Sequence, residues 1–242
     1  MKRLDVFLHD GGFAESRTEA KRLIEAGKVK ILGKTVTKPS YLIEDENILP
    51  EIEKEEFRYA SRGGLKLQAA IDSFNISPNE KLCIDIGAST GGFTDCLLQH
   101  GAAGVVCIDS GSGQLKDFLR RDGRVVCIEN YNARELNKND LPYTPSLAVM
   151  DVSFISATYI ITAVFSVLDG GGEFILLIKP QFEVGKSGLS KGGIVKDEKK
   201  RKGAIDKVVS YAESVGFRTV GVIESPITGG DGNTEYIAYF RK

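Results

Sequence analysis

The sequence predicts a Rossmann-like α/β fold with a mostly parallel sheet, preceded by a small α+β domain. Between residues 82 and 215, apolar runs typical of strands alternate with helical stretches, and this alternation indicates a doubly wound sheet. The last two predicted strands, 217–224 and 234–240, have no helix between them, so we expect the sheet to end in an antiparallel hairpin. Residues 1–42 are basic and contain their own short elements, which indicates a separate N-terminal domain.

The elements of the large domain follow from the apolar runs and from the glycine-rich or polar stretches between them. We predict strands near 82–87, 104–109, 124–129, 147–152 and 173–179. We predict helices near 92–100, 112–121, 155–168 and 197–215, and another that begins after Gly63 and Gly64. The Glu-rich residues 43–60 show little periodicity and are interpreted as a linker, so the predicted domains are 1–57 and 58–242.

The composition is that of an ordinary globular protein, because 42% of the 242 residues are hydrophobic and 27% are charged. No apolar run approaches about 18 residues and the N-terminus lacks an apolar signal region, so we expect a cytoplasmic chain that does not span a membrane. The four cysteines form no C-x-x-C pair and only two histidines are present, so we expect buried thiols and no metal site.

The net charge of −1 is unevenly distributed along the chain. Residues 1–42 hold nine basic and five acidic residues, whereas residues 43–57 hold one basic and seven acidic residues. In the N-terminal domain, a helix with apolar residues at 4, 7 and 8 is followed by a second helix that Ser16 to Glu19 would open with a capping box. A strand over 29–32 and a turn at Gly33 and Lys34 follow.

The basic residues of this domain are interpreted as an RNA-binding surface, with a merely solvated helix face as the alternative. Arg17 and Lys21 are four residues apart and share one face of the second helix. The loop 185–196 fails the spacing of a P-loop, and we expect it to be either a cationic loop that follows an RNA backbone or a disordered connection. The candidate RNA-binding residues are Arg3, Arg17, Lys21, Arg22, Lys28, Lys30, Arg62, Lys186 and Lys191.

The stretch K-L-C-I-D-I-G-A-S-T-G-G-F-T-D at residues 81–95 predicts a cofactor site, because a strand, a glycine-rich turn and a helix N-terminus follow one another. We expect the glycines to let a cofactor approach the backbone. Ser89 occupies the second glycine position of a dinucleotide fingerprint, so S-adenosylmethionine is favoured over a nicotinamide cofactor, and a glycine turn that binds nothing is the remaining alternative. Asp85 suits the cationic methyl donor, and Asp109 suits ribose hydroxyls. The candidate cofactor-binding residues are Asp85, Gly87, Ser89, Gly91, Gly92, Phe93, Asp109, Glu129 and Asn130.

Four charged residues stand out on or beside the predicted elements, and two of them follow strand ends at the cofactor crevice. Lys179 follows the buried run E-F-I-L-L-I, and Asp151 ends the preceding strand. Lys66 lies on the helix before the sheet, and Glu235 begins the last strand. Each of them alone could simply cap the sheet.

Together these residues resemble a known family. The N-terminal residues R-L-D-V-F-L-H-D-G-G-F-A-E-S-R-T-E-A-K-R-L-I-E-A-G-K-V-K-I-L-G-K are similar to the small RNA-binding domain named after a ribosomal small-subunit protein. The motifs S-R-G-G-L-K-L, D-I-G-A-S-T-G-G-F-T-D, M-D-V-S-F, L-L-I-K-P-Q-F-E and G-N-T-E-Y resemble those of FtsJ-type RNA ribose 2′-O-methyltransferases. The combination is similar to the TlyA family, whose members are named both as haemolysins and as rRNA 2′-O-methyltransferases.

The resemblance implies that S-adenosylmethionine is the cofactor and that rRNA, at a cytidine ribose, is the substrate. It implies a catalytic set of Lys66, Asp151, Lys179 and Glu235. A second positive charge at Lys66 would favour a neutral Lys179, whereas Asp151 and Glu235 would favour charged lysines, so both a proton-accepting and a positioning role for Lys179 are open. The alternatives are a non-catalytic RNA-binding or ribosome-assembly factor and a membrane-active haemolysin, and a nicotinamide oxidoreductase is disfavoured.

Overall fold

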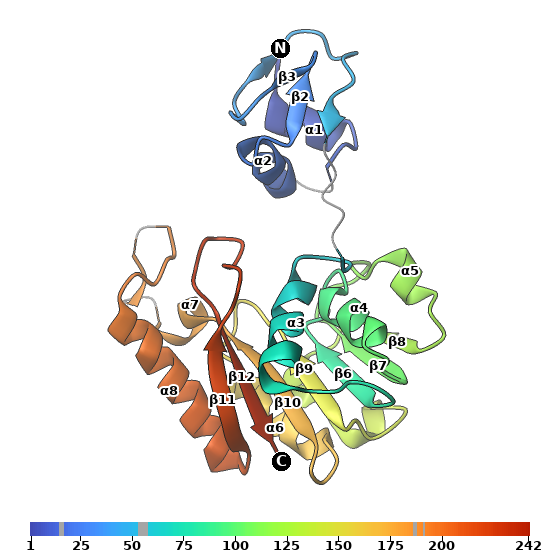
Figure 1. The fold of residues 1–242 in the computed structure, drawn as a ribbon, viewed down its shortest axis with the longest axis vertical. Helices are drawn as coiled ribbons and strands as arrows, with labels where there is room; N and C mark the ends of the chain where they lie inside the picture. The colour runs from blue at the N-terminus through green and yellow to red at the C-terminus, as the bar shows by residue number, and fades with distance from the viewer. Residues whose placement is uncertain (15–16, 53–57, 186–187, 191) are drawn as a thin grey trace. The chain divides into compact units, whose positions relative to one another are not determined.

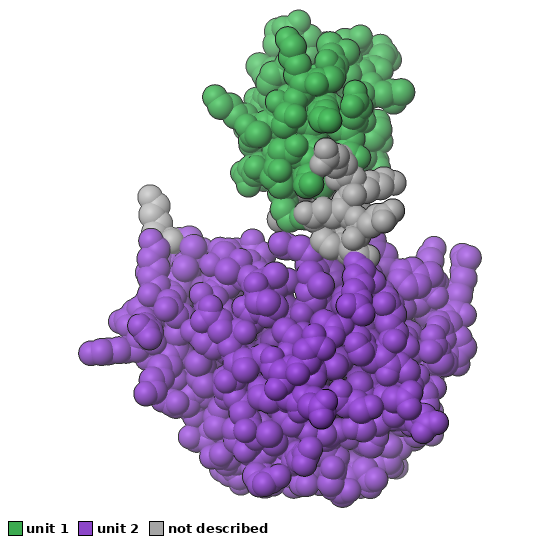
Figure 2. All heavy atoms as spheres, in the orientation of Figure 1, with its two compact units in different colours: residues 1–56 green, residues 57–242 purple. Residues whose placement is uncertain are grey.

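The structure is a computed structural model, and it describes residues 1–14, 17–52, 58–185, 188–190 and 192–242. The chain divides into two compact units, Met1–Glu56 and Phe57–Lys242, which are coloured separately in Figure 2. Each unit has its own hydrophobic core. The predicted capping box at Ser16 and Glu19 lies outside the described side chains.

The N-terminal unit packs two helices against short antiparallel strands. Its elements are β1 (Lys2–Arg3), α1 (Leu4–Asp10), α2 (Arg17–Glu25), β2 (Val29–Ile31), β3 (Lys34–Thr35), β4 (Leu42–Ile43) and β5 (Glu51–Ile52). Strand β1 pairs with β4, and β2 pairs with both β3 and β5. Apolar residues of both helices, such as Leu8 and Ile24, are fully buried.

Two expectations for this unit are corrected. The segment 43–60 is not simply a linker, because Ile43 and Glu51–Ile52 belong to strands that pair within the unit. Strands of two residues carry no readable periodicity, and their partners are distant in sequence. The turn after β2 is formed by Leu32 and Gly33, both at positive φ, and not by Gly33 and Lys34.

The large unit is built on a seven-stranded sheet, counted over the described residues, with the strand order β11-β12-β10-β9-β6-β7-β8. Its strands are β6 (Leu82–Ile86), β7 (Gly104–Ile108), β8 (Val125–Ile128), β9 (Leu147–Met150), β10 (Glu173–Ile178), β11 (Arg218–Glu224) and β12 (Tyr236–Arg241). Neighbouring strands from β8 to β10 are parallel, whereas β12 is antiparallel to both β10 and β11. The predicted mostly parallel sheet with a final antiparallel hairpin is confirmed.

Helices cover both faces of this sheet (Figure 1). They are α3 (Gly63–Phe74), α4 (Gly92–Gln99), α5 (Asp117–Arg120), α6 (Thr158–Val167), α7 (Pro180–Glu183) and α8 (Glu198–Val215), with short 3₁₀ turns at Ala133–Glu135 and Lys138–Asp140. One core cluster joins α3, α4 and α5 to one face, and a second joins α6 and α8 to the other. The helix predicted over 112–121 is only one turn long, because Gly113 has a φ of +67° that no α-helix accepts.

Candidate functional site

The loop between β6 and α4 holds the tips of two neighbouring strands together. The backbone N–H of Gly87 donates to the carbonyl of Ile108 at 2.8 Å, and the N–H of Ser89 donates to Oδ2 of Asp109 at 2.8 Å. Ser89 has a φ of +47°, an uncommon conformation for a residue with a side chain. The carboxyl ends of β6 and β7 therefore present a fixed loop of backbone and one carboxylate to the crevice.

The glycines of this loop are required by the packing of the chain itself, which differs from the expected reason. A Cβ on Gly87 would lie 2.5 Å from the backbone oxygen of Asp151, and Gly87 has a φ of +83°. A Cβ on Gly92 would lie 2.3 Å from Oγ of Ser61. These glycines let β9 and the segment before α3 approach the loop, and Gly87 and Gly92 also line the crevice, so their expected role in admitting a cofactor stays a prediction.

Two cavities adjoin at the carboxyl edge of the sheet. The first, which we call the Lys179 cavity, measures about 300 Å³, and the second, the Asp109 cavity, measures about 500 Å³. Both are lined by Gly87, Ser89, Asp151 and Ser153, so they form one continuous crevice. An elongated ligand could therefore reach from the tip of β7 to the lysines.

Three of the four predicted catalytic residues, Lys66, Asp151 and Lys179, line the Lys179 cavity, and the fourth, Glu235, contacts Lys66 from behind the lining. Nζ of Lys66 lies 2.5 Å from Oε2 of Glu235, and these two side chains are 10% and 2% exposed. Nζ of Lys179 lies 2.5 Å from Oδ1 of Asp151, and their side chains are 10% and 20% exposed. Two mostly buried lysine–carboxylate pairs thus come from α3, the end of β9, the end of β10 and the start of β12.

Asp109 and the residues after β8 shape the other cavity. Asp109 lines it, and its two carboxylate oxygens accept from the N–H groups of Ser89 and Gly111 while each keeps further lone pairs. Glu129 does not line it among the described residues, because its carboxylate accepts from Arg120 at 2.6 Å and from Gly113 N–H at 2.8 Å. The Arg120 hydrogen bond holds the pKa of Glu129 below its usual range.

Sequence analysis missed several residues that do line the Asp109 cavity. They are Gln114, Tyr131, Asn132, Arg134 and Phe154. They lie in loops without regular periodicity, so their direction could not be predicted. Asn130 itself has a φ of +55°, and the cavity lining begins at the next residue.

Asp85 is placed differently from the expectation. It is fully buried and lines neither cavity, and its Oδ2 accepts from Oγ1 of Thr94 at 2.6 Å. Burial raises the pKa of Asp85 to about 7, against the opposing hydrogen bond from Thr94. Its Oδ1 has no hydrogen-bond partner within the described part of the chain. Asp85 supports the cofactor loop from beneath and does not face the crevice.

Some of the other predicted loop residues line the crevice, and one lies beneath the loop. Gly92 and Phe93 line the Lys179 cavity, as does Arg62, which precedes α3. Gly91 directly precedes α4 and has a φ of +93°. A Cβ on Gly91 would lie 2.2 Å from Leu119.

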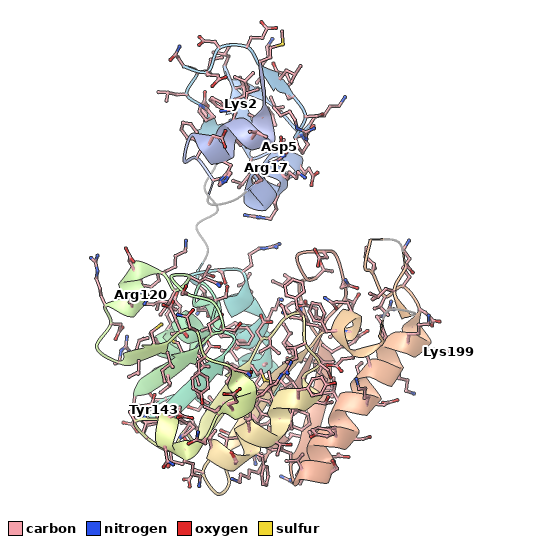
Figure 3. The ribbon with its side chains drawn as sticks, turned by 180° about the vertical axis from the view of Figure 1, so that it is seen from behind. Lys2, Asp5, Arg17, Arg120, Tyr143 and Lys199 are labelled. Carbon is pink, nitrogen blue, oxygen red and sulfur yellow. The ribbon has the colours of Figure 1, made fainter. Side chains whose placement is uncertain are left out.

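The predicted RNA-binding residues of the N-terminal unit have two kinds of surroundings. Arg3 and Arg17 both contact the carboxylate of Asp5, which is fully buried, at 2.9 Å and 3.3 Å. Asp5 and Arg17 are labelled in Figure 3. These arginines hold the pKa of Asp5 below its usual range. Lys21 is exposed on α2, and Arg22, Lys28 and Lys30 are partly buried. Lys186 and Lys191 lie outside the described residues.

The sheet has β12 inserted antiparallel, and its crevice has Asp109 at one end and charged residues at the other. Together with the family match, these features define a methyltransferase that uses S-adenosylmethionine. Residues 59–242 match the family model of FtsJ-like methyltransferases, and residues 2–49 match that of the S4 domain. The chain belongs to the FtsJ-like methyltransferase family and carries an S4 domain.

Relatives extend over nearly the whole chain. It is 44% identical over 241 residues to Hemolysin A of Brachyspira hyodysenteriae, covering 98% of this chain and 99% of that protein. It is 41% identical over 239 residues to the 16S/23S rRNA (cytidine-2′-O)-methyltransferase TlyA of Mycobacterium tuberculosis, covering 99% and 89%. The solved structure of a hemolysin-like protein from Streptococcus thermophilus matches with a TM-score of 0.81 at 41% identity, over 100% of this chain and 88% of that one.

Proposed function

We propose that this chain transfers a methyl group from S-adenosylmethionine to the 2′-hydroxyl of a cytidine ribose in ribosomal RNA. The observation that carries the proposal is the Lys179 cavity, where two lysine–carboxylate pairs lie beside the cofactor crevice. The activity in the name of the Mycobacterium tuberculosis relative and the S4 domain of this chain support an rRNA substrate. The partner is then ribosomal RNA or a ribosomal subunit, and the place of action is the cytoplasm.

The residues of the crevice fit the methyl donor. Asp109 has lone pairs left for ribose hydroxyls, and Tyr131 and Asn132 line the wall beside it. Asp151 lines both cavities, so its carboxylate would attract the cationic end of the donor. When bound, S-adenosylmethionine supplies an electrophilic methyl group carried by a sulfonium.

The lysine pairs are placed to handle the substrate hydroxyl. The hydroxyl must lose its proton as its oxygen forms the new bond to carbon, and Lys179 and Asp151 are the paired proton-handling groups that line the cavity. Lys66 adds a second positive charge, and buried Glu235 fixes its position. Arg62 at the cavity wall is placed to contact a backbone phosphate. Alignment of these groups with the donor supplies most of the acceleration in such a displacement.

The test is transfer of labelled methyl from S-adenosylmethionine to rRNA by Lys179→Met and by the unchanged chain. We expect a loss of at least about 100-fold in kcat, because both proton handling and alignment are removed. Lys81→Met is the matched control, since Lys81 also pairs with a strand carboxylate, Glu173, but at the opposite edge of the sheet. Full activity of Lys179→Met would contradict the proposed site.

A membrane-active function is supported only by names, those of the Brachyspira hyodysenteriae relative and of the Streptococcus thermophilus structure. Within the described residues, none of the helices has both the length and the apolar character needed to cross a bilayer. Leakage of dye from liposomes on addition of the purified chain would support lysis. A chain that binds rRNA but shows no calorimetric binding of S-adenosylmethionine would instead support a non-catalytic assembly factor.

A further inference from the structure

Ser153 lies where the two cavities meet. Strand β9 ends at Met150, and the next three residues run along the carboxyl edge of the sheet before the chain turns at Phe154, which has a φ of +64°. Ser153 lines both the Lys179 cavity and the Asp109 cavity. It was not among the residues predicted from the sequence.

The hydroxyl of Ser153 makes a direct contact with the proposed catalytic amine. Nζ of Lys179 donates to Oγ of Ser153 at 2.7 Å and lies 2.5 Å from Oδ1 of Asp151. The contact with Ser153 is a hydrogen bond, whereas the contact with Asp151 is an ion pair, and Oδ1 of Asp151 has no hydrogen-bond partner within the described residues. Both partners come from one short segment, so they hold the nitrogen from one side of the cavity, and Ser153 fixes the direction of one of its N–H groups.

We propose that Ser153 is a positioning residue that orients the amine of Lys179 towards the ribose hydroxyl. This inference rests on the proposed function, because it assumes that the hydroxyl enters the Lys179 cavity. If Asp151 were the only partner, the amine of Lys179 could rotate while keeping that one contact, because lysine has a flexible side chain. With Ser153 as the second partner, the same direction is presented whether Lys179 accepts the proton or holds the hydroxyl.

A purely structural role does not account for this contact. Ser153 is exposed, so its hydroxyl can be satisfied by water without the lysine, and Lys179 keeps its ion pair with Asp151 when the hydroxyl is removed. We therefore expect substitutions of Ser153 to leave the fold intact and to act on the reaction.

The kinetic test compares Ser153→Ala with Ser153→Thr, which keeps the hydroxyl. In Ser153→Ala we expect kcat to fall about 10-fold, the worth of one hydrogen bond to a charged group, while the KM for rRNA and the Kd for S-adenosylmethionine stay within about twofold. Ser153→Thr should restore most of kcat. Ser166→Ala is the control, because Ser166 is also exposed and makes one hydrogen bond, to the carbonyl of Ala163 on α6. A wild-type kcat in Ser153→Ala would overturn the proposal.

A second measurement decides the contact without relying on methyl transfer. Acylation of Lys179 by an amine-reactive ester, followed by mass spectrometry, should become several-fold faster in Ser153→Ala, with Lys66 as the internal reference. Equal labelling rates in Ser153→Ala and the unchanged chain would overturn the positioning role. If the unchanged chain transferred no methyl group to rRNA, the proposed function would fail, and this labelling would still decide whether Ser153 holds the amine.

Discussion

At the scale of single residues, the direction of a side chain on its strand is what the sequence could not provide. An acidic residue near the end of β6 was expected to face the methyl donor, but Asp85 points to the same face as Cys83, against α3 and α4. Alternate residues of a strand point to opposite faces, so the register of β6 decides this direction. Lys179 and Asp151 follow the last residues of their strands, and there the edge position alone was enough to bring them together.

Asp85 gives the protein a pH-dependent stability. Its pKa is raised by burial to about 7, and the nearby carboxylates of Asp151 and Asp109 contribute to the rise. An unfolded aspartate titrates near 4, so between about pH 4 and pH 7 the folded state holds a proton that the unfolded state has lost, and stability falls as pH rises through this window. Thr94 and Cys107, which face this carboxylate from α4 and β7, carry no charge in that range.

We therefore expect Asp85→Asn to flatten the fall of the free energy of unfolding between pH 4.5 and pH 8 by on the order of a few kcal/mol. Urea denaturation at several pH values measures this difference. If the amide introduced by Asp85→Asn finds no hydrogen-bond acceptor, the free energy of unfolding would fall by the same amount at every pH, and its slope against pH would not change. Parallel profiles for the two proteins would show that Asp85 is ionised in the folded state at neutral pH.

At the scale of elements, long apolar runs were predictable and short or glycine-containing elements were not. Strands β7 and β10 were found because runs of four or five consecutive apolar residues indicate burial on both faces of a sheet, and β6 was found although Asp85 interrupts its apolar residues. The single turn of α5 was overestimated, and yet that turn matters, because its Leu119 packs beneath the start of α4. The loop at Gly91 depends on this contact.

Two glycine-to-alanine changes should have opposite effects on stability. Gly91→Ala places a Cβ 2.2 Å from Leu119 and 2.7 Å from Leu115 at a φ of +93°, so we expect a loss of at least about 2 kcal/mol and weaker binding of S-adenosylmethionine. Gly203→Ala lies on the exposed face of α8 with open space around the new Cβ, so we expect a gain of about 0.5–1 kcal/mol. Urea denaturation of both variants is the measurement. Equal effects would mean that the α5 contact does not constrain the loop.

At the scale of the whole molecule, the sequence predicted which residues form the site but not how each surface is used. Lys66 and Glu235 are far apart in the chain, and the resemblance to a known family, not their spacing, indicated that they act together. The basic character of residues 1–42 was also evident from composition. Composition did not show which basic residues form ion pairs within the unit. Arg3 contacts Asp5 locally, and Arg17 contacts it only because α1 and α2 pack together.

This division predicts different consequences for two cations on the same helix. Lys21 is exposed on α2, so Lys21→Gln should weaken binding to rRNA transcribed in vitro and lower the slope of log K against log salt by about 0.7–0.9, the value of one phosphate contact. Arg17→Gln should also lower the free energy of unfolding, because it removes one of the two arginine partners of buried Asp5. Arg218→Gln, at the exposed start of β11, is the control and should change neither quantity. Filter binding at several salt concentrations, together with urea denaturation, separates the two effects. Equal salt slopes for Lys21→Gln and Arg218→Gln would remove this face of α2 from the RNA interface.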